Sequence, residues 1–228
     1  MSAIKTGMLF NTSIVDTVAS TLKEFYLGKS MPIPPLIIDP VCVSTSGHHL
    51  LEESALTNLV ERLFPLATLI TPNKAEAELL LKLTTPIGTI DEAISAARAL
   101  GTILQNSSND NRKLNVLLKG GHLAVKNSDL RTFFANTSDK KIRLESEPSD
   151  SKRAHILQQT SGDEVDHSDD DRQVIDVLFE ADSDSCTLFS RPHIETSSTH
   201  GTGCTLSAAI TCFISSGNTR EHLTLPIS

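Results

Sequence analysis

Short apolar segments alternate with amphipathic ones along most of this chain, and that alternation constrains the fold more than any other feature. Residues 36–38, 67–70 and 116–118 are brief apolar runs of the kind that form buried strands. The segments between them carry apolar residues at helical spacing, and parallel neighbouring strands need such crossover helices. The pattern therefore predicts an α/β fold whose mostly parallel central sheet is covered by helices on both faces.

Polar residues and glycines follow each of the three strands directly. The residues just past the strand ends are Asp39, Asn73 with Glu76, and Lys119 with Gly120. In an open parallel sheet, ligands bind at the carboxyl ends of the strands. We therefore expect these residues to border one crevice.

The segment from Gly201 to Cys204 precedes an apolar run that predicts a helix through Ile214. Glycines allow the backbone to approach an anion closely, and a helix N-terminus attracts negative charge. We expect backbone N–H groups of Gly201, Thr202 and Gly203 to stabilise a phosphoryl group. A cysteine in the first helical turn is expected to have a lowered pKa, so Cys204 is the candidate proton acceptor. A tight turn followed by a buried cysteine is the alternative interpretation.

Each strand-end residue also has two interpretations. Lys119 is expected to bind nucleotide phosphates, with Gly120 allowing close approach; an ordinary surface lysine is the alternative. Asn73 and Glu76 are expected to hold waters of a hydrated Mg²⁺, although an N-cap and a first-turn acid would use the same residue types. Asp39 is expected to orient the metal or the lysine, and a turn-forming Asp-Pro pair is the competing account.

The composition narrows the class of protein. The chain has 228 residues, which suits one domain, and a net charge of −8 without a run of Lys and Arg, so neither nucleic acid nor a membrane is an expected partner. No apolar run approaches the ~18 residues of a membrane span, and the start lacks a signal-peptide pattern, so we expect a cytosolic protein. The cysteines lack the spacing of a zinc site.

Residues 145–172 differ from the rest of the chain, because Ser, Asp and Glu dominate them. Low hydrophobicity with high charge predicts a disordered acidic insertion, either a solvated loop or a regulatory, partner-binding one. Residues 174–178 and 186–189 then predict an antiparallel hairpin that leads to the glycine–cysteine turn.

Five motifs occur in a fixed order along the chain. They are KTGML at 5–9, DPVCVSTSGH at 39–48, TPNKAEA at 71–77, KGGH at 119–122 and HGTGCTLS at 200–207. Together they resemble the hydroxymethylpyrimidine/phosphomethylpyrimidine kinases of thiamine biosynthesis, within the ribokinase-like superfamily. The cysteine at position 204 resembles the pyrimidine kinase branch, because pyridoxal kinases and sugar kinases of the superfamily usually carry aspartate at this position.

The resemblance implies a three-layer α/β/α fold and a kinase that uses ATP and Mg²⁺ to phosphorylate a hydroxymethylpyrimidine and then its monophosphate. It implies that the pyrimidine pocket is lined by Met8, Val41 and Cys204. It also implies that ATP and its metal are served by Lys119, Asn73, Glu76 and Asp39.

The chain departs from the family pattern at both ends. The family has a section before the KxGML strand that carries a glycine-rich substrate loop, and further helices after the last motif. We therefore expect residues 1–228 to form a single incomplete domain, truncated at both ends and without the N-terminal strands. Two alternative functions are a non-catalytic family member that binds nucleotide or pyrimidine, and a pyridoxal kinase. The sequence also leaves open whether the chain forms a homodimer.

Overall fold

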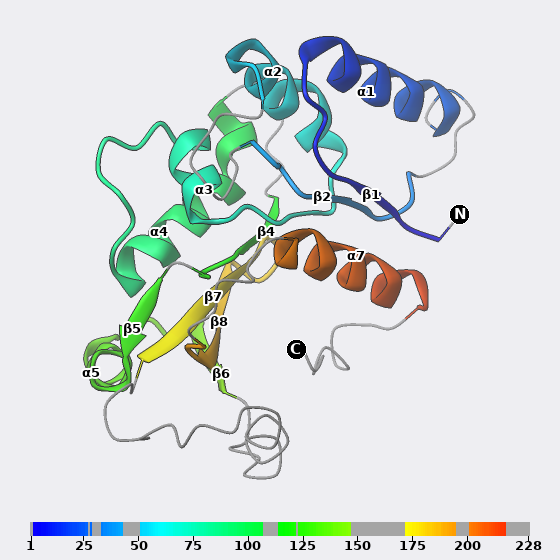
Figure 1. Cartoon of the computed structure of the whole chain (residues 1–228). Coiled ribbons are helices and arrows are strands. Elements are labelled where there is room, and N and C mark those ends of the chain that lie inside the picture. The colour runs from blue at the N-terminus through cyan, green and yellow to red at the C-terminus, as the bar shows by residue number, and fades with distance from the viewer. Residues whose placement is uncertain are drawn as a thin grey trace, which may run out of the picture.

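The computed structural model describes residues 2–26, 28, 33–42, 51–106, 114–121, 123–146, 172–194 and 201–217. These residues build one eight-stranded sheet with helices on both faces, as Figure 1 shows. The strand order is β1-β2-β3-β4-β7-β8-β6, and β5 pairs with β7 beside this path.

The first four strands form the parallel half of the sheet. They are β1 (Ile4–Thr6), β2 (Leu36–Ile38), β3 (Leu69–Ile70) and β4 (Asn115–Leu118). Each pairs with the next in parallel, and every residue of β2 is fully buried. Burial on both faces explains why these strands are continuous apolar runs rather than alternating ones.

The other half of the sheet is mixed. The strands β7 (Arg172–Glu180) and β8 (Ser185–Pro192) form the antiparallel hairpin that the sequence predicted. Next to them lie β5 (Ala124–Lys126), antiparallel to β7, and β6 (Ile142–Ser146), parallel to β8. The prediction of an α/β fold with a mostly parallel sheet is confirmed. The strands β5 and β6 of the mixed half were not predicted.

Helices connect the strands. The α-helices are α1 (Thr12–Tyr26), α2 (Glu53–Asn58), α3 (Lys74–Leu80), α4 (Ile90–Gly101), α5 (Asn127–Asn136) and α7 (Thr202–Ser215). A π-helical turn at Leu59–Leu63 and 3₁₀ turns at Phe64–Leu66 and Ile103–Asn106 complete the described set. Reciprocal capping boxes start both α3 and α4, because each has a side-chain acceptor at the N-cap and glutamate three residues later.

The two faces of the sheet carry cores of different size. Most of the buried apolar side chains belong to one cluster that joins the sheet to α1 through α5. On the opposite face, where α7 lies, the buried cluster consists of Ile37, Leu69, Leu117 and Ile210. Figure 1 shows α7 across the sheet from α1 and α2.

The expected acidic insertion has narrower limits than 145–172. Glu145 and Ser146 belong to β6, and Arg172 begins β7, because these residues pair with neighbouring strands. The remaining residues of the insertion, 147–171, lie outside the described part of the chain, so their expected disorder stays a prediction.

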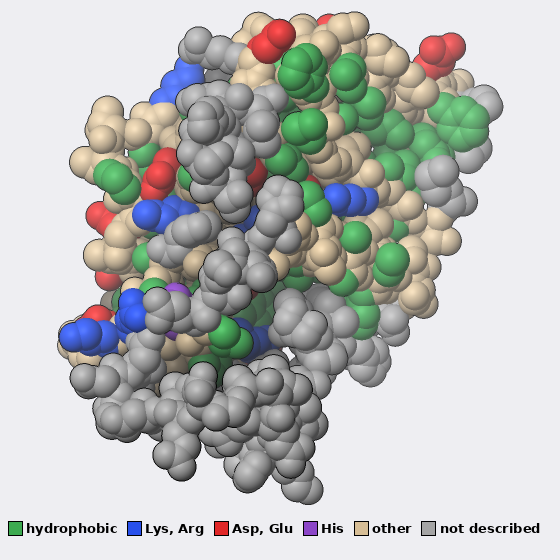
Figure 2. All heavy atoms as spheres, viewed as in Figure 1, with side chains coloured by type: hydrophobic (Ala, Val, Ile, Leu, Met, Phe, Trp, Pro, Cys, Tyr) green, Lys and Arg blue, Asp and Glu red, His purple; other side chains and the backbone are tan. Residues whose placement is uncertain are grey.

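The surface carries mixed charge. Figure 2 shows Lys and Arg side chains dispersed among acidic and apolar ones on the face in view. Ile14 and Phe25 of α1 are 42% and 48% exposed. Within the described residues, none of the helices has both the length and the apolar character required to cross a bilayer.

Candidate active site

The carboxyl ends of β1 through β4 meet at one edge of the sheet, as predicted. The backbone N–H of Asp39 donates to the carbonyl oxygen of Thr6 at 3.0 Å, and that of Thr71 donates to Ile38 at 2.9 Å. The N–H of Lys119 donates to the carbonyl oxygen of Pro72 at 2.8 Å. These bonds continue the parallel pairing past the strand ends and bring the predicted polar residues side by side.

Asp39 is the centre of this edge. Its carboxylate is 1% exposed and pairs through Oδ1 with the Nζ of Lys119 at 2.8 Å. The hydroxyl of Thr71 also lies 3.4 Å from Oδ1, and the hydroxyl of Ser207 on α7 donates to Oδ2 at 3.2 Å. A buried carboxylate needs such partners, because an unpaired buried charge is strongly destabilising. The expectation that Asp39 orients the lysine therefore has a geometric basis.

The glycine turn lies against this ion pair. Gly201 adopts φ 83° immediately before α7, a left-handed conformation that favours glycine. A Cβ atom at Gly203 would lie 2.9 Å from the Nζ of Lys119, so a side chain there would push the lysine away. The structure thus places Gly203, in the first turn of α7, beside the Lys119 amine, and Gly201 and Thr202 directly precede it in the chain.

Cys204 is exposed in the first turn of α7, as expected, but its expected acidity is wrong. Partial burial raises the pKa of the Cys204 thiol, and the negative charge of Asp39 raises it further. The cationic side chains of Lys5 and Lys119 act in the opposite direction without reversing the rise. The sequence rule considered only the helix N-terminus, whereas the largest charge effect comes from Asp39 at the end of β2.

Asn73 and Glu76 form a reciprocal capping box at the start of α3. The Oδ1 of Asn73 accepts from the Glu76 N–H at 2.9 Å, and Oε2 of Glu76 accepts from the Asn73 N–H at 2.7 Å. Glu76 is 2% exposed, and burial raises its pKa to about 7. The capping interpretation of these two residues is therefore confirmed, and a role for them beside a hydrated metal stays a prediction.

The expected pyrimidine contacts begin at the same edge. Met8 lies just past β1 and is 55% exposed, whereas Val41 lies just past β2 and is half-buried. Three motif segments, 43–48, His122 and His200, lie outside the described residues. In the described part of the chain, no group of three His, Cys, Asp or Glu side chains is arranged to hold a metal directly.

A sequence profile of the phosphomethylpyrimidine kinase family matches residues 1–156 and 160–222 of this chain. The chain belongs to that family. The family match includes the polar residues at the three strand ends and the start of α7 that lie at this edge of the sheet.

Two relatives show how far the sequence similarity extends. The chain is 32% identical over 215 residues to the thiamine biosynthetic bifunctional enzyme TH1 of Arabidopsis thaliana, covering 94% of this chain and 29% of that protein. It is 42% identical over 123 residues to the hydroxymethylpyrimidine/phosphomethylpyrimidine kinase of Mycobacterium bovis, covering 54% of this chain and 39% of that kinase. The chain therefore spans less than half the length of these two relatives.

A solved structure supports the fold. The ADP complex of Bacillus subtilis pyridoxal kinase superposes with a TM-score of 0.61 at 25% identity, covering 97% of this chain and 60% of that one. The structural match shows that this chain shares its α/β fold with the matched part of that kinase.

Two residues of this edge were missed by the sequence interpretation. Thr71 and Ser207 are both fully buried, and both place hydroxyl groups on the Asp39 carboxylate. A buried serine on a helix that packs against strand ends is a usable signal, because a buried hydroxyl needs a partner. That partner lies 168 residues away in the sequence, so only the folded chain identifies it.

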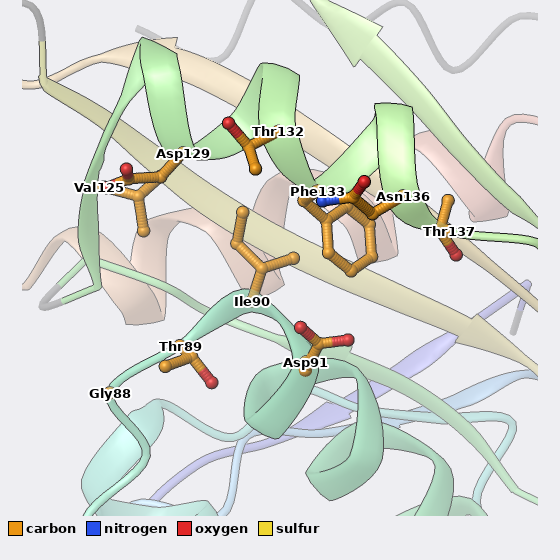
Figure 3. A pocket seen from close by; sticks show the side chains of 10 residues that line it. All are labelled: Gly88, Thr89, Ile90, Asp91, Val125, Asp129, Thr132, Phe133, Asn136 and Thr137. Carbon is orange, nitrogen blue, oxygen red and sulfur yellow. The ribbon is translucent and has the colours of Figure 1, made fainter.

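A cavity lies away from these residues. It has a volume of about 430 Å³ and lies between the start of α4 and the side chains of α5, and Figure 3 shows the side chains that line it. Its lining includes Ile90, Asp91, Asp129 and Phe133 but none of the strand-end residues described above. This cavity is therefore separate from the candidate active site.

Proposed function

We propose that this chain carries the phosphoryl-transfer part of a kinase that uses ATP to phosphorylate a hydroxymethylpyrimidine and its monophosphate. The observation that carries the proposal is the position of the Lys119 amine, 2.8 Å from the carboxylate of Asp39 and against Gly203. A cation beside the N-terminus of a helix is the arrangement that phosphoryl transfer needs, because positioning and charge neutralisation dominate that reaction.

The nucleotide phosphates would bind at Lys119 and the adjoining turn at Gly120. The N–H groups of Gly201, Thr202 and Gly203 would stabilise the negative charge on the phosphoryl group during transfer. The Bacillus subtilis pyridoxal kinase structure is an ADP complex, and this supports nucleotide binding by the present chain.

Magnesium would be held through its water molecules. Asp39 and Glu76 provide oxygen donors of the kind that Mg²⁺ prefers. The charge of Asp39 contributes to the raised pKa of Glu76. A hydrated cation near both would relieve that repulsion, with Asn73 at the helix start beside them.

Cys204 would take the proton of the attacking hydroxyl. The hydroxyl oxygen forms a bond to the γ-phosphorus, the bond from that phosphorus to ADP breaks, and the proton moves to the cysteine thiolate. The raised pKa of Cys204 makes its thiolate rarer at neutral pH but a stronger base when it forms. Met8 and Val41 would contact the pyrimidine ring beside it.

The test is ATP consumption by the purified chain with hydroxymethylpyrimidine as substrate and pyridoxal as the competing one. We expect turnover of the pyrimidine, and a loss of about 100-fold or more in Cys204→Ala, the scale of a general base. Cys212→Ala is the matched control, because Cys212 is also an exposed cysteine of α7 and should leave turnover unchanged.

Other outcomes have distinct meanings. Preference for pyridoxal would replace the proposed substrate, and equal losses in the two cysteine variants would remove Cys204 from the reaction. A folded chain that binds an ATP analogue without turning over either substrate would favour the non-catalytic alternative.

A further inference from the structure

Asp176 lies on β7 beside the turn that carries Lys119. Its neighbours Ile175 and Val177 are fully buried in the larger core, so the side chain of Asp176 points to the other face of the sheet. That face also holds Leu178 in the cluster with α7. The Asp176 carboxylate is therefore on the same side of the sheet as α7 and the glycine turn that precedes it.

A short hydrogen bond connects this carboxylate to the lysine turn. The backbone N–H of Gly120 donates to Oδ1 of Asp176 at 2.6 Å. Gly120 has no space for a side chain, because a Cβ atom there would collide with the carbonyl oxygen of Ile175. The turn after β4 is thus packed directly on the backbone of β7, and the side chain of Asp176 bonds to it there.

Further bonds hold the remainder of the turn. The N–H of Lys119 donates to Pro72 at 2.8 Å, and the carbonyl oxygen of Gly120 accepts from the Leu123 N–H at 2.6 Å. The first bond ties the turn to the end of β3, and the second closes it on itself. Asp176 supplies the side-chain contact that ties it to β7.

The charge of Asp176 is placed where it affects the site. Burial raises the pKa of Asp176, while the Gly120 N–H and the charges of Arg191 and Lys119 oppose that rise. Lys119 therefore lies within the field of two carboxylates, with Asp39 on its amine and Asp176 on the next backbone N–H.

We propose that Asp176 is a positioning residue that fixes the turn at Lys119 and Gly120 and so sets where the lysine amine meets a nucleotide phosphate. The part of this inference that concerns the nucleotide rests on the proposed function. The part that concerns the position of the lysine does not. The positioning role depends on the hydrogen bond to the Gly120 N–H. An asparagine at position 176 keeps an acceptor for that N–H, whereas an alanine does not.

The experiment compares Asp176→Ala and Asp176→Asn with Asp129→Ala, an exposed carboxylate on α5 that serves as control. Two readouts are taken from each folded protein. The first is the KM for ATP and kcat with hydroxymethylpyrimidine. The second is the rate at which an amine-reactive reagent labels Lys119, measured by mass spectrometry against Lys74.

We expect Asp176→Ala to raise the KM for ATP by about tenfold, equivalent to ~1.4 kcal/mol, with a smaller change in kcat. Lys119 labelling should change by several-fold in the same variant, and Asp176→Asn should restore both readouts most of the way. A purely structural role would instead lower the folded fraction and leave the KM and the Lys119 labelling of the folded molecules unchanged, and that result overturns the proposal.

The two proposals fail separately. If the wild-type chain showed neither turnover nor ATP binding, the proposed kinase function would be wrong. The labelling of Lys119 would still decide whether Asp176 positions that lysine. Labelling that is equal in wild type, Asp176→Ala and Asp129→Ala would overturn the positioning role even in an active kinase.

Discussion

The two faces of the central sheet do different work. One face packs α1 through α5 on an extensive buried cluster, whereas the face under α7 buries only a small one among the described residues. Yet the Lys119–Asp39 ion pair of the candidate site contacts the α7 side, where Gly203 lies against Lys119 and Ser207 bonds to Asp39. Most of the apolar burial and this ion pair therefore lie on opposite faces of the same strands.

The largest expected effect concerns matched isoleucines on the two faces. Ile94 of α4 is 4% exposed and Ile210 of α7 is 6% exposed. We expect Ile94→Ala to lower the free energy of unfolding by about 4 kcal/mol and Ile210→Ala by about 2 kcal/mol, because the cavity is more completely enclosed in the larger core. Urea denaturation of the two variants measures the difference. Equal losses would show that the two faces contribute alike to stability.

The next effect concerns Glu76, a buried acid on the well-packed side of the site. Its pKa is raised from 4.5 to about 7, so its contribution to stability is full below pH 4.5 and is lost as the pH rises through about 7. Glu76→Gln removes this titration while keeping an acceptor for the capping box. The shift corresponds to roughly 3 kcal/mol, so the wild type should lose about that much relative to the variant over this range.

Urea denaturation of wild type and Glu76→Gln at several pH values, without magnesium, tests this expectation. Parallel curves for the two proteins would mean that Glu76 titrates normally and that the start of α3 is open to water.

The smallest effect is a difference in thiol reactivity. Cys42 is fully buried with a pKa raised to about 12 by burial and by the charges of Glu76 and Asp39, whereas Cys204 and Cys212 of α7 are exposed. At about pH 8, iodoacetamide should label the two α7 cysteines well before Cys42. Peptide mass spectrometry measures the order, and labelling in urea confirms that every site can react.

Rapid labelling of Cys42 in the folded protein would contradict the assignment of a closed face. It would indicate that the chain after β2 opens to solvent, which would also expose Asp39.

Local patterns were the part of the fold that the sequence predicted well. The hairpin of β7 and β8 and the helix that runs through Ile214 depend on residues close in the chain. The strand-end residues were also predictable, because parallel strands must place their carboxyl ends at one edge. The segment 124–146 was missed, since its strands β5 and β6 acquire their structure by pairing with β7 and β8.

The electrostatics of the site could not be predicted from local sequence. A lowered pKa for Cys204 follows from the helix N-terminus alone, but partial burial and the charge of Asp39 reverse it. Ser207 and Asp176 were missed for the same reason, because their partners Asp39 and Gly120 come from distant strands. Such effects depend on tertiary distances that no local spacing encodes.

Because Lys119 and Asp39 already form an ion pair, the Asp39 carboxylate competes with any incoming anion for the Lys119 amine. An arriving phosphate meets a lysine that is satisfied by a carboxylate at 2.8 Å, so its affinity is the difference between two pairings rather than the strength of one. A weakly charged anion gains little from the exchange. A ligand that also engages the helix N-terminus gains more, and the internal pair thereby acts as a filter for what the site will hold.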